Sequence, residues 1–374
     1  MVTQGVTSPP FRADHVGSLL RPPAVRQARD DAAAGRITPA ELRAIEDDAI
    51  ATMVRMQEDV GLRSATDGEL RRGSWHMDFI YQLGGISRAE ENLVVQFQNT
   101  EGTIEFTPAA LRVDGKVRLE QPIFADAFRF LADTVTTAVP KLTIPSPSMV
   151  HYRGGRASID PGLYPDLDQF WDDLSAAYAA EVKALAALGC RYLQLDDTSL
   201  AYLNDPHQRE MIASKGGDAE HQHERYIRQI NAALADRPEG MTVTTHSCRG
   251  NFRSSWVAEG GYDFVAESLF NELAVDGFFL EYDDARSGGF EPLRFVPPGK
   301  RVVLGLVTTK RGALEDKDAL KRRIDEAARF IPLDQLCLSP QCGFASTLEG
   351  NDLTYDEQVA KLALVVETAA EVWG

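Results

Sequence analysis

A histidine and a cysteine stand two residues apart at the end of a predicted strand, where they could hold a metal ion. His246 and Cys248 follow the apolar, β-branched run 241–245. Alternate residues of an extended chain project to the same side, so both side chains can reach one ion. Such a triplet also arises by chance, and a buried cysteine is commonly an inert core residue. The triplet alone therefore leaves a ligand pair and a packed core residue equally open.

Two later strand ends supply further donor atoms. Glu281 closes one apolar run, and Cys342 comes just after another. Imidazole nitrogen, thiolate sulfur and carboxylate oxygen together form a donor set suited to zinc. Glu267 and Glu272 are nearby alternatives, but the position of Glu281 at the end of an apolar run favours it. The four candidate metal ligands are therefore His246, Cys248, Glu281 and Cys342.

Composition indicates a globular protein that does not bind nucleic acid. The 374 residues are 44% apolar and 25% charged, and 39 basic residues against 56 acidic ones give a net charge of −17. This charge argues against nucleic-acid partners, although a local cleft can still be basic. Four cysteines are too few for a disulfide framework, and metal-binding thiolates require a reducing compartment.

Nothing in the chain predicts a membrane span or a signal peptide. No run approaches the roughly 18 apolar residues that a spanning helix needs. The first residues lack the charged and apolar regions of a secretory signal. We therefore expect a cytoplasmic protein without a membrane partner.

Strand-like runs alternate with helical stretches along the whole chain. This βα repeat indicates a parallel sheet, and eight units predict an α/β fold, a single (β/α)8 TIM barrel that spans residues 1–374 as one catalytic domain. An open doubly wound sheet is the rival, but no G-x-G-x-x-G motif follows the first strand. The eight expected strands lie within residues 11–20, 61–68, 141–147, 191–197, 241–245, 277–281, 301–307 and 335–339.

One stretch, about 92–122, breaks the repeat. Residues 93–98 and 103–106 alternate between polar and apolar, and 111–119 carries Asp114-Gly115 between alternating runs, which is a hairpin signal. We expect an antiparallel hairpin insertion on the barrel. It would serve as a lid or as a dimer arm without chemistry, and it makes a homodimer plausible.

Polar residues recur at the ends of successive predicted strands. In a parallel barrel these carboxyl ends meet at one face, where the chemistry of such folds takes place. Asp196 and Asp197 are adjacent on a strand and point opposite ways, so only one can face the mouth, and a helix N-cap is the alternative role. The polar strand ends are His15 to Ser18, Asp67 to Glu69, Ser146, Asp196-Asp197, His246 with Cys248, Glu281, Lys310 and Cys342.

These residues match a known family. The chain resembles the C-terminal catalytic barrel of cobalamin-independent methionine synthase, and particularly the short, single-barrel members of that superfamily. The motifs span nearly the whole chain in the expected order. They are Asp14-His15-Val16-Gly17-Ser18, Thr66-Asp67-Gly68-Glu69, Leu193-Gln194-Leu195-Asp196-Asp197, His246-Ser247-Cys248, Phe279-Leu280-Glu281 and Pro340-Gln341-Cys342-Gly343.

The resemblance implies a zinc-dependent S-methyltransferase, most directly from a methylfolate-type donor to homocysteine. It implies a Zn²⁺ site at the four candidate ligands, and it places Gly17, Ser18 and Glu69 near the amino-acid end of the thiol substrate. Asp196 would face the ammonium group of that substrate, and Asp196 and Glu69 would be the catalytic carboxylates. Other roles stay open from the residues alone: Glu69 could begin a helix, and Gly17-Ser18 could form a plain turn.

The chain departs from the long enzyme of this family in two respects. The long enzyme has an additional N-terminal barrel, and it has an Asp and a His where this chain has Thr308 and Lys310. Thiol addition to an epoxide, as in epoxyalkane:coenzyme M transferases, is therefore an alternative, with Lys310 and Arg249 as candidate partners of a sulfonate. A third alternative is a zinc-binding protein without turnover, which predicts a closed metal site without a connected pocket.

Overall fold

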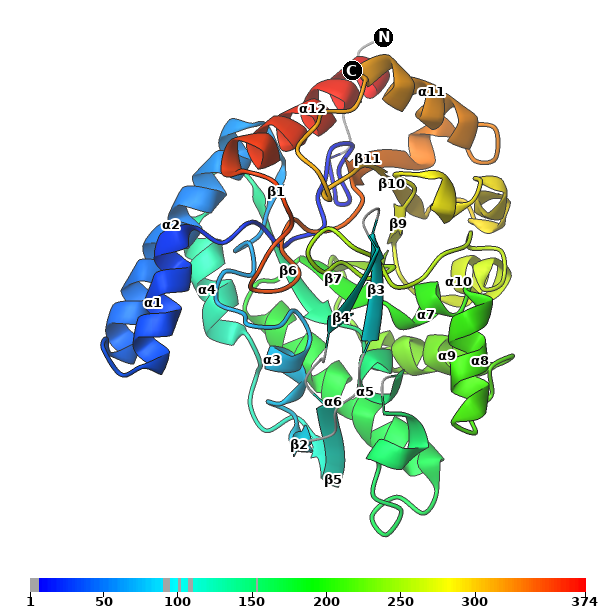
Figure 1. Ribbon diagram of the computed structural model, residues 1–374. Helices are drawn as coiled ribbons and strands as arrows, with labels where there is room; N and C mark the ends of the chain where they lie inside the picture. Colours follow the sequence, from blue (N-terminus) through cyan, green and yellow to red (C-terminus); the bar gives the residue numbers. More distant parts are fainter. Residues whose placement is uncertain (1–6, 90–94, 100–101, 107–109, 153) are drawn as a thin grey trace.

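The computed structural model describes residues 7–89, 95–99, 102–106, 110–152 and 154–374. Its centre is a curled parallel sheet of seven strands in the order β1-β6-β7-β8-β9-β10-β11, so that each strand lies beside its predecessor in the chain (Figure 1). This is the α/β alternation that the sequence predicts. The strands are β1 Ser64–Ala65, β6 Val139–Pro145, β7 Tyr192–Asp197, β8 Thr242–Ser247, β9 Gly277–Glu281, β10 Arg301–Val307 and β11 Leu336–Pro340.

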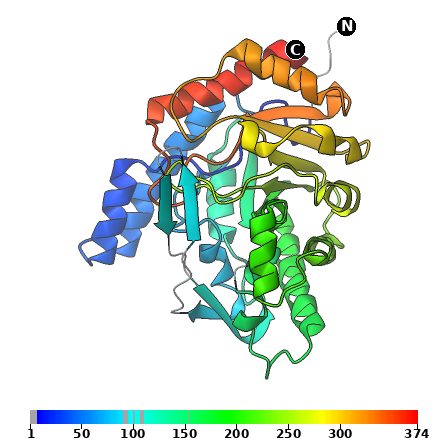
Figure 2. The same ribbon diagram turned by 45° about the vertical axis from the view of Figure 1, so that its right-hand side comes forward.

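Helices surround the sheet on its outer side (Figures 1 and 2). Local signals in the sequence set several of their ends: Thr38 and Thr354 each form a reciprocal capping box with the glutamate three residues on. The α-helices are α1 Pro23–Ala33, α2 Pro39–Asp59, α3 Met77–Ile80, α4 Ala125–Thr134, α5 Ser148–Tyr152, α6 Leu167–Ala187, α7 Ser199–Tyr202, α8 Pro206–Ser214, α9 Gln222–Leu234, α10 Ala266–Glu272, α11 Lys317–Ala327 and α12 Tyr355–Trp373. In the described part of the chain, none of them is long and apolar enough to cross a membrane.

The first expected strand, within residues 11–20, does not form a strand. The segment makes one parallel bridge, between Ala13 and Leu338, and then contacts the β1 side through Leu19 N, which donates to Gly68 O at 3.0 Å. It therefore lies between β11 and β1 without a regular ladder. The reason is local: the Asp14 carboxylate accepts hydrogen bonds from the backbone N–H groups of Phe11 and His15, which turns the chain away from an extended path.

Two antiparallel strand pairs lie in or next to the stretch 92–122 among the described residues, with β2 ahead of the expected start of the insertion. Strand β2 Gly84–Ala89 pairs with β5 Ala110–Arg118, and β3 Val95–Asn99 pairs with β4 Gly102–Phe106. Residues 92–94, 100–101 and 107–109 of the expected insertion lie outside the described part. The hairpin expected within 111–119 is wrong, because Asp114-Gly115 lies inside the continuous strand β5.

The physical reason is a close backbone contact. A Cβ atom on Gly115 would lie 2.9 Å from Gly85 Cα, at the point where the β2–β5 register shifts. The glycine therefore allows β2 and β5 to approach closely at an irregularity of their pairing. Besides forming turns, glycine commonly has this role in sheets.

The interior of the curled sheet is partly polar. Lys141 Nζ lies 3.3 Å from Asp14 Oδ1, and the hydroxyls of Tyr192 and Ser64 donate to the same carboxylate at 2.8 and 2.9 Å. A small apolar cluster that includes Val16 packs alongside. These buried, mutually satisfied groups anchor the N-terminal segment and so hold the residues that follow it at the carboxyl ends of the strands.

The packing between neighbouring strands at the polar ends of the sheet can be tested by substituting Gly305. A Cβ atom there would lie 2.6 Å from Gln341 Cα and 2.8 Å from Leu280 O, both of which are backbone atoms. We expect Gly305→Ala to lower the free energy of unfolding by about 1–3 kcal/mol, measured by urea denaturation. Gly73→Ala is the control, because its nearest neighbour would be an Asp78 oxygen at 3.8 Å. Equal stability of the two variants would contradict this packing.

Candidate metal centre and adjoining pocket

The four predicted ligands meet at one point of the structure. One donor atom from each of His246, Cys248, Glu281 and Cys342 lies within 4.8 Å of the others, and the two sulfurs are 3.5 Å apart. Glu267 and Glu272, the alternatives to Glu281, lie on α10 and do not belong to this group.

Parallel strand ends bring these residues together. His246 belongs to β8, with Cys248 one residue beyond that strand, and Glu281 is the last residue of β9. Cys342 lies two residues beyond β11. Because β8, β9, β10 and β11 pair in sequence, their carboxyl ends form one edge, and residues near those ends converge there.

The donor atoms are free to accept a cation. His246 Nδ1 lies 3.3 Å from Asp196 Oδ1, while Nε2 is buried without a hydrogen-bond partner among the described residues. Glu281 Oε1 accepts from the backbone N–H of Arg249 at 3.1 Å. Its buried Oε2 makes no hydrogen bond in the same part of the chain and lies 3.9 Å from Arg286 Nη2. A carboxylate that orients the non-ligating nitrogen of a histidine is the usual support of a metal site. The residues therefore fit a four-coordinate ion with N, S and O ligands.

Electrostatics at the cluster also favour a cation. The hydrogen bond from Cys248 holds the pKa of the Cys342 thiol well below its usual value, against the effect of burial. Burial opposes a charge on His246, yet Asp196 and Cys342 raise the pKa of its imidazole to about 10. The site thus attracts positive charge, which a proton supplies at the imidazole and a metal ion would supply at all four residues.

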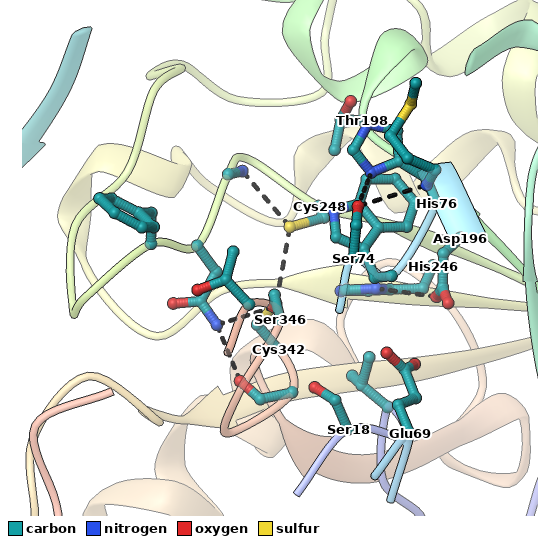
Figure 3. A pocket seen from close by; sticks show the side chains of 18 of the residues that line it. Ser18, Glu69, Ser74, His76, Asp196, Thr198, His246, Cys248, Cys342 and Ser346 are labelled. Carbon is teal, nitrogen blue, oxygen red and sulfur yellow. Dashed lines mark hydrogen bonds and ion pairs between the residues drawn. The ribbon is translucent and has the colours of Figure 1, made fainter. Parts of the chain in front are cut away.

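A cavity of about 290 Å³ adjoins the cluster (Figure 3). His246, Cys248 and Cys342 line it, and so do Ser18, Glu69 and Asp196. Figure 3 shows the two sulfurs on one side of the space and the two carboxylates on the other. A small molecule in this cavity could therefore touch the metal centre with one end and the carboxylates with the other.

Glu69 is a buried carboxylate with an open oxygen. Its Oε1 accepts from Thr143 Oγ1 at 2.9 Å and lies 3.6 Å from Arg72 Nη1, while the buried Oε2 has no hydrogen-bond partner among the described residues. Burial raises the pKa of Glu69 to about 7, and Arg72 opposes this effect while Asp196 adds to it. The backbone of Glu69 has a φ of 57°, in the left-handed region, and the next helix begins only at Met77. The alternative that Glu69 begins a helix is therefore wrong.

The two adjacent aspartates have separate roles. Asp196 lines the cavity, and its Oδ1 accepts from Gln194 Nε2 at 2.7 Å. Asp197 is fully buried on the other side of β7, where it accepts from Leu200 N and Ser199 Oγ at the start of α7. Asp197 thus bonds to the first turn of α7, whose N-cap residue is Thr198, while Asp196 faces the pocket.

Gly17 and Ser18 approach the cavity from the N-terminal segment. Gly17 has a φ of 145°, and a Cβ atom there would lie 2.7 Å from Thr143 Cγ2, so only glycine fits. Ser18 lines the cavity, and its carbonyl accepts from Phe344 N at 2.9 Å. This contact ties the segment to the loop that carries Cys342.

Other cavity residues had no assigned role from sequence. Trp75 and His76 line the cavity. Phe97 of β3 and Phe252 also line it, and the rings of these two phenylalanines are 5.4 Å apart. No chemical motif marks these aromatic residues, because only the fold brings them to the same wall. Arg249, a candidate partner for a sulfonate, is buried with its guanidinium bonded to the carbonyls of Glu281 and Gly260.

Comparisons with a family model and with known proteins assign the chain to the same family. The model of the cobalamin-independent synthase catalytic domain matches residues 11–371. The uncharacterized protein YxjH of Bacillus subtilis is 49% identical over 97% of this chain and 95% of its own length. Methionine synthase of Pyrococcus abyssi is 23% identical over 83% of this chain and 79% of its own.

Solved structures agree with this result. The crystal structure of the putative vitamin-B12 independent methionine synthase from Listeria monocytogenes is 39% identical, with a TM-score of 0.77 and 98% of each chain covered. A B12-independent methionine synthase from Shewanella, solved with selenomethionine, shares the fold at 18% identity, with a TM-score of 0.70 over 96% of this chain and 97% of that one. The chain therefore belongs to the cobalamin-independent synthase catalytic-domain family, which is a family of methyltransferases.

Proposed function

We propose that the protein is a zinc-dependent S-methyltransferase that converts homocysteine to methionine with a methylfolate-type donor. One observation carries this proposal: a single cavity of about 290 Å³ adjoins the four metal-type donors, with the two sulfurs on one side and the carboxylates of Glu69 and Asp196 on the other (Figure 3). That spacing suits a small amino acid with a thiol at one end and an ammonium group at the other. The family of the chain supports the same reaction.

The metal would be held by His246, Cys248, Glu281 and Cys342. When bound, zinc supplies the means to ionise a thiol at neutral pH, where the free thiol is mostly protonated and poorly nucleophilic. Asp196 orients His246 through the 3.3 Å contact at Nδ1. Arg249 fixes the Glu281 carboxylate through its backbone N–H.

The carboxylates would bind the amino-acid end of the substrate. Glu69 and Asp196 together offer negative charge to an ammonium group, and the open Oε2 of Glu69 would accept one of its hydrogens. Ser18, with the backbone near Gly17, would hold the substrate carboxylate. Thr143 and Arg72 keep Glu69 in place, so they act by positioning it.

The two alternatives fit the pocket less well. A sulfonate-bearing thiol would place its negative end near Glu69 and Asp196, where like charges repel. Arg249 is occupied by carbonyl oxygens, and Lys310 lines a different cavity. A metal-binding protein without turnover would not need an open, substrate-sized cavity at its ligands, and this chain has one.

We extend the proposal to the domain organisation and the location of the protein. Residues 1–374 would form one (β/α)8 domain in which the segment 12–19 takes the eighth position of the barrel. The insertion would cover the site, because Gln98 and Trp256 exchange backbone hydrogen bonds of 2.6 and 2.9 Å next to the metal-ligand loop. The free thiols would need a reducing location such as the cytoplasm.

The function is tested by titrating the zinc-loaded protein with homocysteine and, separately, with coenzyme M. We expect homocysteine to bind with release of a proton, followed by methionine formation when 5-methyltetrahydropteroyl glutamate is added, measured by chromatography. Binding of coenzyme M but not of homocysteine would favour the epoxide-type reaction. Absence of binding by either thiol would remove the enzymatic proposal.

The metal site is tested with two cysteines near the same strand. Cys342→Ser should lower the zinc content and the activity together, because a serine hydroxyl is a poor ligand for zinc. Cys337→Ser is the control, since Cys337 is a buried residue of β11 outside the cluster. Zinc content is measured by mass spectrometry, with circular dichroism to verify folding. Full metal content in the Cys342 variant would take that residue out of the site.

The role of Glu69 predicts a pH dependence for methionine, a product without a titrating thiol. Burial raises the pKa of Glu69 to about 7, so a proton must leave before the carboxylate can pair with an ammonium group. Methionine affinity should therefore weaken as the pH falls below about 7, by up to about tenfold per unit, and level off above it. In Glu69→Gln the affinity should be weaker and flat over this range. An unchanged profile in the variant would show that Glu69 does not bind the amino group.

A further inference from the structure

Lys310 carries a buried ammonium group beside the metal cluster. It lies three residues beyond β10, and its Nζ is enclosed without a hydrogen bond or ion pair to any residue that the structure describes. Burying an unpaired charge is unfavourable, so such a group requires compensation.

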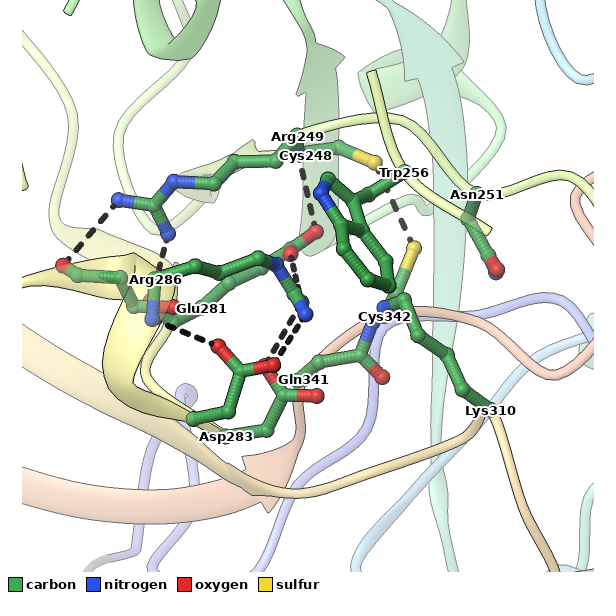
Figure 4. A network of polar contacts seen from close by, with 12 residues as sticks. Cys248, Arg249, Asn251, Trp256, Glu281, Asp283, Arg286, Lys310, Gln341 and Cys342 are labelled. Atoms are coloured by element: carbon green, nitrogen blue, oxygen red, sulfur yellow. Dashed lines mark hydrogen bonds and ion pairs between the residues drawn. The ribbon is translucent and has the colours of Figure 1, made fainter. Parts of the chain in front are cut away.

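The other cations beside the metal cluster are already engaged. Arg249 binds the carbonyl oxygens of Gly260 and Glu281, each at 2.8 Å. Arg286 pairs with Asp283 at 3.1 Å and with Asp284, and its Nη2 also lies 3.9 Å from Glu281 Oε2. Figure 4 shows both arginines on the Glu281 side of the cluster and Lys310 on the Cys342 side. Of these three cations, Lys310 has no partner among the described residues.

Lys310 is nevertheless a neighbour of the cluster, because its side chain lies beside Cys342, one of the four candidate ligands (Figure 4). Lys310 lines a second cavity, of about 640 Å³, together with Arg286 and Trp256, so it approaches the cluster from outside the thiol pocket.

The charge of the metal-loaded cluster explains how Lys310 could contribute to the site. Two thiolates and one carboxylate already exceed the two positive charges of a zinc ion, so the loaded centre is anionic before any substrate arrives. A substrate thiolate adds a further negative charge within a buried region, where Coulomb interactions are strong. A nearby cation without another partner can offset that charge.

We propose that Lys310 is the countercharge of the thiolate-bound site, a positioning residue that sets the affinity for the thiol substrate. This inference rests on the proposed function. On binding, the thiol S–H bond breaks and its proton passes to the solvent, while the sulfur keeps the electron pair and nothing is oxidised or reduced. Lys310 keeps its proton throughout, and its contribution is to make the thiolate form less costly to bury.

The experiment compares three variants of the zinc-loaded protein by calorimetric titration with homocysteine in two buffers of different ionisation enthalpy. Lys310→Met removes the charge with little change of length, and Lys310→Arg retains it. Lys317→Met is the matched control, because Lys317 pairs with Glu367 and Glu371 on the protein surface. Zinc content and circular dichroism are measured for every variant.

We expect Lys310→Met to bind homocysteine on the order of tenfold more weakly, or worse, and to release fewer protons per thiol bound at neutral pH. Its zinc content should stay full, because removing a positive charge does not weaken the attraction for a dication. Lys310→Arg should retain most of the affinity, and Lys317→Met should match the original protein.

Three results would overturn the inference. The first is an unchanged thiol affinity in Lys310→Met, and the second is equal weakening in the Met and Arg variants. The third is a loss of zinc in parallel with affinity, which would indicate a structural role. Should the original protein bind coenzyme M but not homocysteine, the proposed substrate fails while the same comparison with coenzyme M still decides the role of Lys310. Should it bind no thiol, both proposals fail.

Discussion

The site depends on the parallel pairing of β7 to β11, because that pairing puts the carboxyl ends of five strands at one edge. Asp196 pairs with His246 in the β7–β8 register, and Glu281 pairs with Gly305 in the β9–β10 register. A shift of one residue in either pair would turn the side chains to the other face of the sheet. Gly305 permits the close approach that this geometry requires, since a side chain there would strike the backbone on both sides.

A second constraint acts through the buried Asp14. Its carboxylate accepts from two backbone N–H groups of its own segment and from the hydroxyls of Tyr192 and Ser64, and it faces the ammonium group of Lys141. These contacts compete with a regular strand ladder and hold the segment in an irregular path. Gly17 and Ser18 thereby reach the rim of the sheet. The part of the chain with the least regular structure is thus positioned by a polar network in the interior.

The pocket combines opposite electrostatic demands at its two ends. The cluster of thiols, imidazole and Glu281 requires positive charge, which a metal ion would provide. Glu69 and Asp196 lie across the cavity from the two sulfurs (Figure 3), and burial, with a smaller contribution from Asp196, raises the pKa of Glu69 to about 7. A thiol that carries an ammonium group is complementary to both the metal cluster and the two carboxylates. A thiol with an anionic end is complementary to the metal cluster only. Lys310 lies outside this pocket, where it can balance charge without occupying substrate space.

The residue types at the strand ends, the βα alternation and elements such as β9, β10 and α12 can be predicted from the sequence, because periodicity and caps are local properties. The folded chain is needed to show that Asp197 bonds to the first turn of α7 while Asp196 faces the pocket, and that Asp114-Gly115 runs through a strand. The structure also shows that residues 11–20 form no strand and that Lys310 Nζ has no hydrogen-bond partner among the residues it describes. These outcomes depend on specific contacts of the folded chain, some between distant segments and some local, such as those of Asp14 with Phe11 and His15, and residue propensity does not contain them.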